Sequence, residues 1–476
     1  MVEAAVPRIR GLIEDALKKH GIPGAAAGIV VGDRLKWSEG FGFADLKTRR
    51  APDANTLFRI ASITKTFTGA AIMQLRDAGK LSLDDPVTIH IPEFKRVRAK
   101  RGSLEQVTLR RLLTHHSGLV TEAPLPYWET LDFPPFDRVL GSLSGVKVVL
   151  EPDTQFKYSN LAFALLGEVV ARVGGRAYPE FVHERLTRPL GLGSTVFELT
   201  PGLRRRFATG YDAHPHSDVP VEAVHHPLGG LLAAGGLYSS VSDLARWVSF
   251  QLGATGSTGD EVLARSTLRE MHRPQILEPD WRAGYGLPWR STRSGDRVYV
   301  NHGGGLPGHR TTVHFDPAHG VGFILLTNLG WHNAPEDVAV PALDAINDAL
   351  PQRPAAATPP PPPPARYRRL LGAYVARNVL FANVEWRDGA LRLVLPPGVR
   401  SMHAPARLEP TADALSFEVV GGRGGGEAAV FEADPQGEIV SFALGGALYR
   451  RLRTQPDAME PSDRQHRDSK ERKGRK

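Results

Sequence analysis

A serine and a lysine three residues apart, Ser62 and Lys65, could act as a nucleophile and its base. The pattern around them predicts a helix over residues 63–78, and side chains three apart lie on one face of a helix. That helix is apolar on most faces, so we expect burial, which lowers a lysine pKa as a base for serine requires. The alternative is that Ser62 only caps the helix and that Lys65 lies at the surface. Ser144 and Lys147 repeat the spacing without a helical pattern, so we set them aside.

A tyrosine and an asparagine, Tyr158 and Asn160, come directly before a predicted helix over residues 161–173. The tyrosine could move a proton, and the asparagine amide could bind a substrate carbonyl. Asparagine is also a favoured helix N-cap, and Tyr158 could be an ordinary core residue. Tyr299 and Asn301 match the same spacing, but they lie in a predicted strand.

A histidine at the end of a predicted strand, His302, precedes three glycines that let a substrate approach the backbone: Gly303, Gly304 and Gly305. An exposed strand edge there would offer N–H groups to an oxyanion. The alternative is a glycine turn with an exposed histidine. Residues 303–308 also fit G-x-G-x-x-G, but Pro307 and the strand-like residues after it contradict a dinucleotide-binding helix.

The elements that must position these residues predict an α+β fold, an α/β sandwich. An amphipathic N-terminal helix ends near Gly21, and its apolar positions are Ile9, Leu12, Ile13, Ala16 and Leu17. Strands are predicted over 25–31, 34–40, 297–302, 310–315 and 321–327, with a helix-rich middle between them. The simplest assembly is one antiparallel sheet built from both chain ends and flanked by helices, with a helical subdomain alongside.

The length of 476 residues favours two or three domains, and we expect four segments. Residues 1–350 form the first domain, and the proline-rich stretch 351–365 forms a stiff linker. Residues 366–455 contain short alternating runs, at 384–387, 391–395, 415–420, 429–432 and 439–444, which predict a small all-β barrel-like domain. Residues 456–476 form a basic disordered tail.

Composition excludes several classes of protein. The chain has no cysteine, which rules out disulfides, thiolate metal sites and cysteine nucleophiles. The formal net charge is +8, but residues 461–476 carry seven Lys/Arg against three Asp/Glu, so we expect no nucleic-acid partner. We find no secretory signal and no membrane-spanning run, and we expect a cytoplasmic protein.

Other catalytic machinery finds little support. There is no G-x-S-x-G elbow, no H-E-x-x-H zinc motif and no phosphate-binding P-loop sequence. The pairs His115-His116 and His225-His226 suggest metal binding, but adjacent side chains point apart, so we expect no metal and no cofactor.

In order and separation, Ser-x-x-Lys at 62, Tyr-x-Asn at 158 and His-Gly-Gly at 302 resemble the signatures of the serine β-lactamase and penicillin-binding protein superfamily. The chain looks most like its class C branch, which also holds esterases and D-aminopeptidases. The resemblance runs from about residue 8 to 350 and includes PGAAAGIVV, LFRIASITKTFTGAAIMQL, LLTHHSGL and GGLYSSVSDLARW. The region opening with Leu371-Gly-Ala-Tyr374 is similar to lipocalin-like barrels appended to some relatives.

The resemblance implies roles for four residues. Ser62 would be the acylated nucleophile, and Lys65 would be its activating partner. Tyr158 would act in proton transfer to the leaving group and later to water, and Asn160 would hold the substrate amide or acyl side chain. Which of Lys65 and Tyr158 takes the serine proton stays open.

The resemblance also implies that His302 and the glycines after it line the pocket, with the backbone N–H groups of Ser62 and Gly305 as the oxyanion hole. β-Lactamases of this class usually have lysine where His302 stands, and neutral histidine attracts an antibiotic carboxylate less strongly. We therefore expect an esterase or D-amino-acid peptidase acting on a small molecule or peptide. The alternative is a β-lactamase or penicillin-binding sensor that is acylated but turns over poorly. The oligomeric state stays open.

Overall fold

The structure is a computed structural model that describes residues 2–214, 216–280, 282–350, 362–376, 380–387, 389–394, 405–422 and 424–452. The chain divides into two compact units, residues 1–351 and 352–476. Most of the expected linker, residues 351–361, and the whole expected basic tail, residues 456–476, lie outside the described residues.

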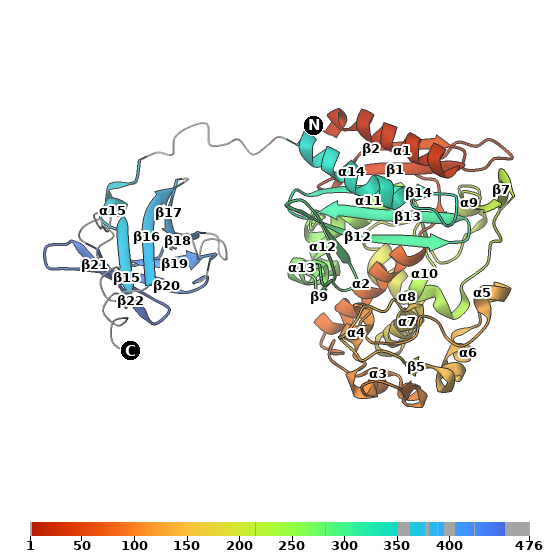
Figure 1. Ribbon diagram of the computed structural model, residues 1–476, viewed down its shortest axis with the longest axis horizontal. Coiled ribbons are helices and arrows are strands. Elements are labelled where there is room, and N and C mark those ends of the chain that lie inside the picture. The colour runs from red at the N-terminus through yellow and green to blue at the C-terminus, as the bar shows by residue number, and fades with distance from the viewer. Residues whose placement is uncertain are drawn as a thin grey trace, which may run out of the picture. The chain divides into compact units, whose positions relative to one another are not determined.

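The centre of the first unit is an antiparallel sheet to which both ends of the segment contribute, as expected (Figure 1). Among the described residues it has eight strands in the order β2-β1-β14-β13-β12-β11-β10-β9. Their bounds are β1 Gly24–Val31, β2 Arg34–Gly42, β9 Ile276–Leu277, β10 Ala283–Tyr285, β11 Arg290–Ser294, β12 Arg297–Leu306, β13 His309–Asp316 and β14 Val321–Thr327. In the register that joins the ends, Ala27 of β1 lies opposite Leu325 of β14. The sequence did not predict β9 to β11, which are short, and β11 has no apolar alternation.

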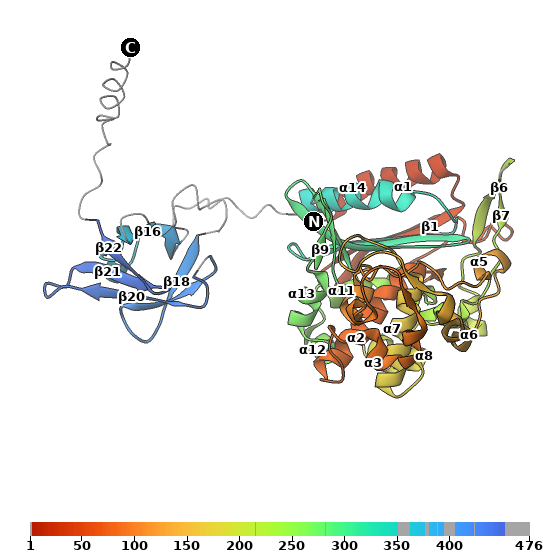
Figure 2. The ribbon, with the colours of Figure 1, turned by 60° about the horizontal axis from the view of Figure 1, so that its bottom comes forward.

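Two helices, α1 (Val6–His20) and α14 (Ala334–Ala349), cover one face of this sheet (Figures 1 and 2). The apolar face of α1 buries Ile9, Ile13 and Ala16 against the sheet and α14. The helix ends where Gly21 adopts the left-handed conformation with φ 63°, which glycine accepts without a Cβ penalty. The predicted N-terminal helix is thus confirmed.

The other face of the sheet is covered by α11 (Val241–Gln251), and the turn that leads into α2 (Thr64–Asp77) packs on β12 and β13 (Figure 2). Within this core the ring of Phe67 in α2 stacks on Trp247 in α11, with centroids 3.8 Å apart. The helical region contains α3 Val87–His90, α4 Leu109–Leu113, α5 Tyr127–Thr130, α6 Phe136–Gly141, α7 Asn160–Gly174, α8 Tyr178–Val182, α9 Pro201–Arg204, α10 Leu232–Gly235, α12 Gly256–Val262 and α13 Arg265–His272.

Three short two-stranded sheets connect segments of the first unit outside the large sheet in the described residues. Their members are β3 Phe58–Arg59 with β8 Tyr238–Ser239, β4 Arg98–Ala99 with β5 Lys147–Val148, and β6 Tyr211–His214 with β7 Ser217–Glu222. The β3–β8 pair fixes the segment that leads into α2, because Arg59 lies opposite Tyr238. No helix in the described part of the chain is long and apolar enough to cross a membrane.

In the described residues of the second unit, α15 (Ala365–Arg368) leads into eight strands that close into a barrel. The strands are β15 Gly372–Ala376, β16 Leu380–Arg387, β17 Ala390–Val394, β18 Ala406–Pro410, β19 Ser416–Val420, β20 Ala428–Ala433, β21 Ile439–Leu444 and β22 Ala447–Arg451. Aromatic rings fill its core, and Tyr374 packs edge-on against Phe442 at 5.0 Å. This agrees with the expected lipocalin-like barrel. The sequence predicted five of these strands and missed β15, β18 and β22.

Candidate active site

Ser62 lies on a single 3-10 turn, Ala61–Ile63, that joins β3 to α2. The sequence predicted a helix from residue 63, but α2 begins at Thr64, and no side chain caps it. Ala61 holds φ 47°, in the left-handed region that costs a residue with a Cβ about 1 kcal/mol. The tight turn presents the Ser62 hydroxyl to a cavity instead of using it as a cap.

Lys65 is completely buried in the first turn of α2, which excludes the surface alternative. Its Nζ lies 3.1 Å from Ser62 Oγ and donates to the Asn160 Oδ1 at 2.8 Å and the Ala234 carbonyl oxygen at 2.7 Å. Burial lowers the pKa of Lys65 to about 7, although the charge of Glu122 opposes this shift. In the neutral form of Lys65, the two amine hydrogens bind the oxygens of Asn160 and Ala234. The lone pair on the Lys65 nitrogen can then face the Ser62 hydroxyl.

Asn160 is not the cap of α7, which corrects the N-cap alternative. Ser159 occupies that position, and its hydroxyl accepts a hydrogen bond from the Ala162 backbone N–H at 3.0 Å. The amide of Asn160 is therefore free to bridge Lys65 and the carboxylate of Glu122, to which its Nδ2 donates at 2.5 Å. Because Lys65 must donate to the amide oxygen, this network also fixes the orientation of the amide.

Glu122 is a site residue that the sequence reasoning missed. One carboxylate oxygen accepts from Asn160, and the other accepts from the hydroxyl of buried Tyr127 at 2.8 Å. The carboxylate also lines the cavity next to Ser62. Its only sequence signal was its place in the stretch after LLTHHSGL, four residues past the glycine, and no spacing rule connects it to Lys65.

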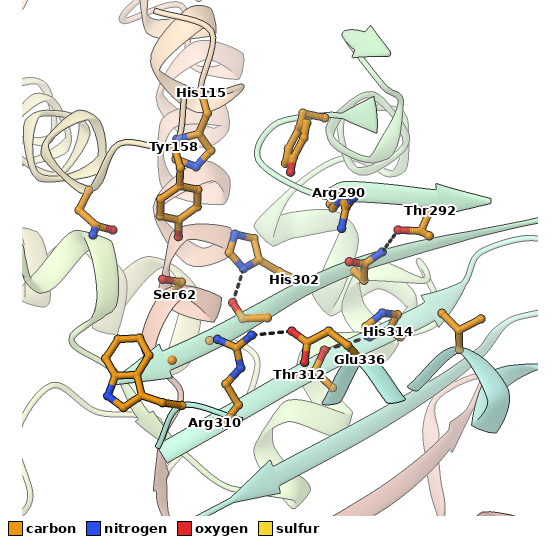
Figure 3. A pocket seen from close by; sticks show the side chains of 18 of the residues that line it. Ser62, His115, Tyr158, Arg290, Thr292, His302, Arg310, Thr312, His314 and Glu336 are labelled. Atoms are coloured by element: carbon orange, nitrogen blue, oxygen red, sulfur yellow. Dashed lines mark hydrogen bonds and ion pairs between the residues drawn. The ribbon is translucent and has the colours of Figure 1, made fainter. Parts of the chain in front are cut away.

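The hydroxyl of Tyr158 points toward Ser62 (Figure 3), and the two side chains interact. Burial raises the pKa of Tyr158 above its ordinary value, although the contact with Ser62 opposes the change. The ring of Tyr158 stacks on that of His115, with centroids 4.2 Å apart. His115 was considered only as a metal ligand, but burial and the charge of Lys65 hold its pKa well below the ordinary value. It therefore supports Tyr158 as a neutral ring, and its Nδ1 accepts from the Ser159 backbone N–H.

His302 and the three glycines after it lie in β12, along one wall of the cavity. Strand β11 pairs with β12 only as far as Asn301, so beyond that point β11 leaves this edge unpaired. Gly304 is required by space, because a Cβ there would lie 2.2 Å from the carbonyl oxygen of Ile60. Leu306 and His309 form the pair that closes the two-residue turn between β12 and β13. Hydrogen-bonded and non-hydrogen-bonded pairs alternate along an antiparallel ladder, so the N–H of the preceding residue, Gly305, points away from β13 toward the open edge.

Gly303 and Gly304 do not begin a dinucleotide-binding helix, because β12 continues into a hairpin turn. His302 Nδ1 lies 2.7 Å from the carbonyl oxygen of Gly303. Burial, together with the charge of Lys65, lowers the pKa of His302 to about 4. His302 is therefore a neutral ring at pH 7.

These side chains surround a cavity of about 650 Å³ (Figure 3). A charged pair lies on the wall of this cavity, where Arg310 donates to the carboxylate of Glu336 at 2.5 Å. The guanidinium of Arg310 reaches Gly305, since a Cβ on that glycine would lie 2.8 Å from the arginine Nη1. Arg290 also lines the cavity and donates to the carboxylate of Glu278 at 3.2 Å, so a carboxylate already pairs with each of these two cations.

The repeated motifs do not form a second site. Ser144 lies in a 3-10 turn and Lys147 in β5, so no helix face joins them. The hydroxyl of Tyr299 donates to Asp344 of α14 at 2.5 Å, and Asn301 donates to Thr292 at 3.0 Å. In the described residues no group of three or more His, Asp and Glu side chains is placed to hold a metal ion.

Known proteins share this architecture. Protein flp of Staphylococcus aureus (strain N315) is 28% identical over 334 residues, which cover 69% of this chain and 64% of that protein. This chain therefore spans less than two thirds of that relative. The octameric penicillin-binding protein homologue from Pyrococcus abyssi matches with a TM-score of 0.61 and 22% identity, covering 93% of this chain and 99% of that one. The class C beta lactamase from Rhodobacter sphaeroides matches with a TM-score of 0.59 and 23% identity, covering 71% and 98%.

The solved structures establish the shared fold, and the sequence match establishes the family. The family model described as Beta-lactamase matches residues 9–347, which include Ser62, Lys65, Tyr158, Asn160 and His302. The chain belongs to the beta-lactamase family.

Proposed function

We propose that this protein hydrolyses an ester or amide through an acyl-enzyme on Ser62, as an esterase or D-amino-acid peptidase. The observation that carries the proposal is the buried Lys65, whose Nζ lies 3.1 Å from the Ser62 hydroxyl. With a pKa of about 7, this lysine is half neutral near neutral pH and can accept the serine proton.

In the acylation step the Ser62 oxygen attacks the substrate carbonyl as its proton moves to Lys65. The new oxyanion would accept hydrogen bonds from the backbone N–H groups of Ser62 and Gly305. Tyr158, whose pKa is raised by burial, holds its proton at neutral pH and faces Ser62. It would pass this proton to the leaving group as the carbonyl re-forms, and Lys65 would return its proton to the tyrosine.

In the deacylation step a water would attack the acyl carbon, and its proton would leave through Tyr158 to Lys65. The C–O bond to Ser62 then breaks, and the serine oxygen recovers a proton. The amide of Asn160 has one N–H beyond the one given to Glu122, and we propose that it binds the acyl carbonyl of the substrate.

The charges around the cavity favour a substrate without a carboxylate beside the scissile bond. His302 is neutral at pH 7, and the two lining cations, Arg310 and Arg290, already pair with Glu336 and Glu278. Glu122 adds negative charge near the nucleophile. A fixed cation for a β-lactam carboxylate is therefore missing at position 302. This supports an ester or peptide over an antibiotic.

The first test compares hydrolysis of a short-chain p-nitrophenyl ester by the wild type, Ser62→Ala and Ser144→Ala. Ser144 is the matched control because it has the same spacing to a lysine but lies outside the cavity. We expect steady turnover by the wild type and Ser144→Ala and none by Ser62→Ala. Turnover that survives Ser62→Ala would disprove the assigned nucleophile.

A chromogenic cephalosporin tests the substrate class. We expect slow hydrolysis by the wild type. The variant His302→Lys offers the antibiotic carboxylate a charge-assisted hydrogen bond, which we expect to raise kcat/KM about 10-fold or more. A burst that leaves a stable acyl mass on Ser62, with neither substrate turned over, would favour a protein that is acylated but does not release product.

A further inference from the structure

Arg59 is a buried cation without a partner, two residues before the turn that carries Ser62. It lies in β3, only 4% of its surface is exposed, and its Nη1 is enclosed without a hydrogen-bond acceptor. Among the described residues it makes no ion pair and no side-chain hydrogen bond. Burial lowers its pKa, and the only other group that influences it is Tyr238. Such a charge is costly to bury, and arginine does not escape the cost by losing its proton.

The side chain of Arg59 lines a cavity of about 160 Å³ that is separate from the catalytic one. None of its lining residues also lines the cavity around Ser62. Further positive and aromatic groups complete the wall, namely Arg204, Phe207, His225 and His309. His309 is almost fully buried, and its Nδ1 has no hydrogen-bond partner, so a second polar atom of the wall is also unsatisfied.

One carboxylate, that of Glu222, also lines this cavity, at an exposed position in β7. It forms no ion pair with Arg59 or Arg204 in the described structure, and it does not influence the pKa of Arg59. The interior of the cavity is therefore positive, while its rim holds one negative side chain.

We propose that this cavity binds a small oxyanion, a carboxylate or a phosphate, held by Arg59 in the interior and by Arg204 at the rim. A planar guanidinium can donate two parallel hydrogen bonds to either group, which makes arginine suited to both. The volume exceeds that of several waters at about 30 Å³ each, so a phosphate or a short carboxylate fits. The site is independent of the proposed hydrolase activity.

The test measures binding of inorganic phosphate and of acetate to the full chain by titration calorimetry, at fixed ionic strength in chloride. Thermal unfolding with the same anions gives a second readout, because a ligand of the folded state raises the midpoint with concentration. We expect one saturable site, with the tighter of the two anions showing which oxyanion the cavity prefers. Absence of binding and of any rise with either anion would overturn the proposal.

Variants locate the site. Arg59→Met should abolish binding and the anion-dependent rise in the unfolding midpoint, while its own midpoint without anion equals or exceeds that of the wild type. Arg204→Gln should weaken binding about 1.4- to 5-fold, and Glu222→Gln should tighten it by a similar factor. Arg205→Gln is the matched control, since it removes a charge next to Arg204 from an exposed side chain outside the cavity.

Equal binding by the wild type and Arg59→Met would place the anion elsewhere and refute the proposal. Loss of anion binding in Arg205→Gln alone would also refute the proposal. If Arg59→Met does not fold, the exposed variants still test the proposal, because binding in this cavity predicts opposite effects from Arg204→Gln and Glu222→Gln and little effect from Arg205→Gln. Equal weakening by Arg204→Gln and Arg205→Gln would refute it.

Discussion

Replacing Lys65 by methionine should abolish hydrolysis and also change how the stability of the fold depends on pH. The wild-type lysine has a pKa of about 7 in the folded protein and 10.5 as its ordinary value. At about 1.4 kcal/mol per pKa unit, burying the protonated amine costs the folded state about 5 kcal/mol at acidic pH. Methionine has a similar length and carries no charge, so the variant does not bear this cost.

The direction of the pH effect follows from proton binding. Between the folded and unfolded pKa values the unfolded state binds more protons, so the stability of the wild type rises with pH. The penalty is complete below about pH 7 and disappears toward pH 10.5. From about pH 7 to about pH 9 the wild type should gain about 2 kcal/mol relative to Lys65→Met. At any single pH the lost contacts with Asn160 and Ala234 offset part of the difference, each by about 1–3 kcal/mol.

Equilibrium unfolding in denaturant, followed by tryptophan fluorescence across this pH range, measures the effect. Ser62→Ala is the matched control, since it also abolishes the proposed activity but retains the buried amine, so its stability should follow the wild type. Parallel curves for the wild type and Lys65→Met would refute the reasoning, because they would mean that burial does not lower the Lys65 pKa.

Further predictions concern the site and the first unit. For a neutral ester, kcat/KM should rise tenfold per pH unit and level off near pH 7, as Lys65 loses its proton. Glu122→Gln should shift this rise of kcat/KM to lower pH in the same assay, because the carboxylate raises the Lys65 pKa. Gly304→Ala should lower both the unfolding midpoint and kcat, since its Cβ would lie 2.2 Å from a backbone carbonyl oxygen; Gly303→Ala, with its nearest contact at 3.6 Å, should be tolerated. A chain truncated after residue 350 should fold and retain ester hydrolysis, and an insoluble or inactive product would contradict the proposed domain boundary.

The motif residues of the proposed chemistry could be identified in the sequence, because Ser62, Lys65, Tyr158, Asn160 and His302 each lie in a short motif at a fixed spacing. Apolar periodicity also predicted α1, α7 and the long strands, since burial of one face leaves a regular trace in the sequence. The short strands β9 to β11 leave no such trace. Neighbouring strands determine them, and β11 consists of Arg290-Ser-Thr-Arg-Ser294.

The contacts between the motifs could not be predicted, because they join residues far apart in the chain. Spacing alone left Asn160 as a helix cap, and only the structure shows that Ser159 caps the helix while Asn160 bridges Lys65 and Glu122. Local sequence gives Glu122 no link to a lysine 57 positions earlier.

The sequence by itself determined the family and the fold class and pointed to Ser62 as the proposed nucleophile, because motif spacing and apolar periodicity are local properties of the chain. The tertiary structure decided which groups are charged. The apolar helix predicted that Lys65 is buried, but the groups that contact it or raise its pKa come from segments distant in the chain, namely Asn160, Ala234 and Glu122. The burial of His302 and Arg59 had no such sequence signal. A pKa or an unpaired charge depends on the solvent and the partners that folding leaves within a few ångströms. These quantities therefore become visible only when the chain is folded.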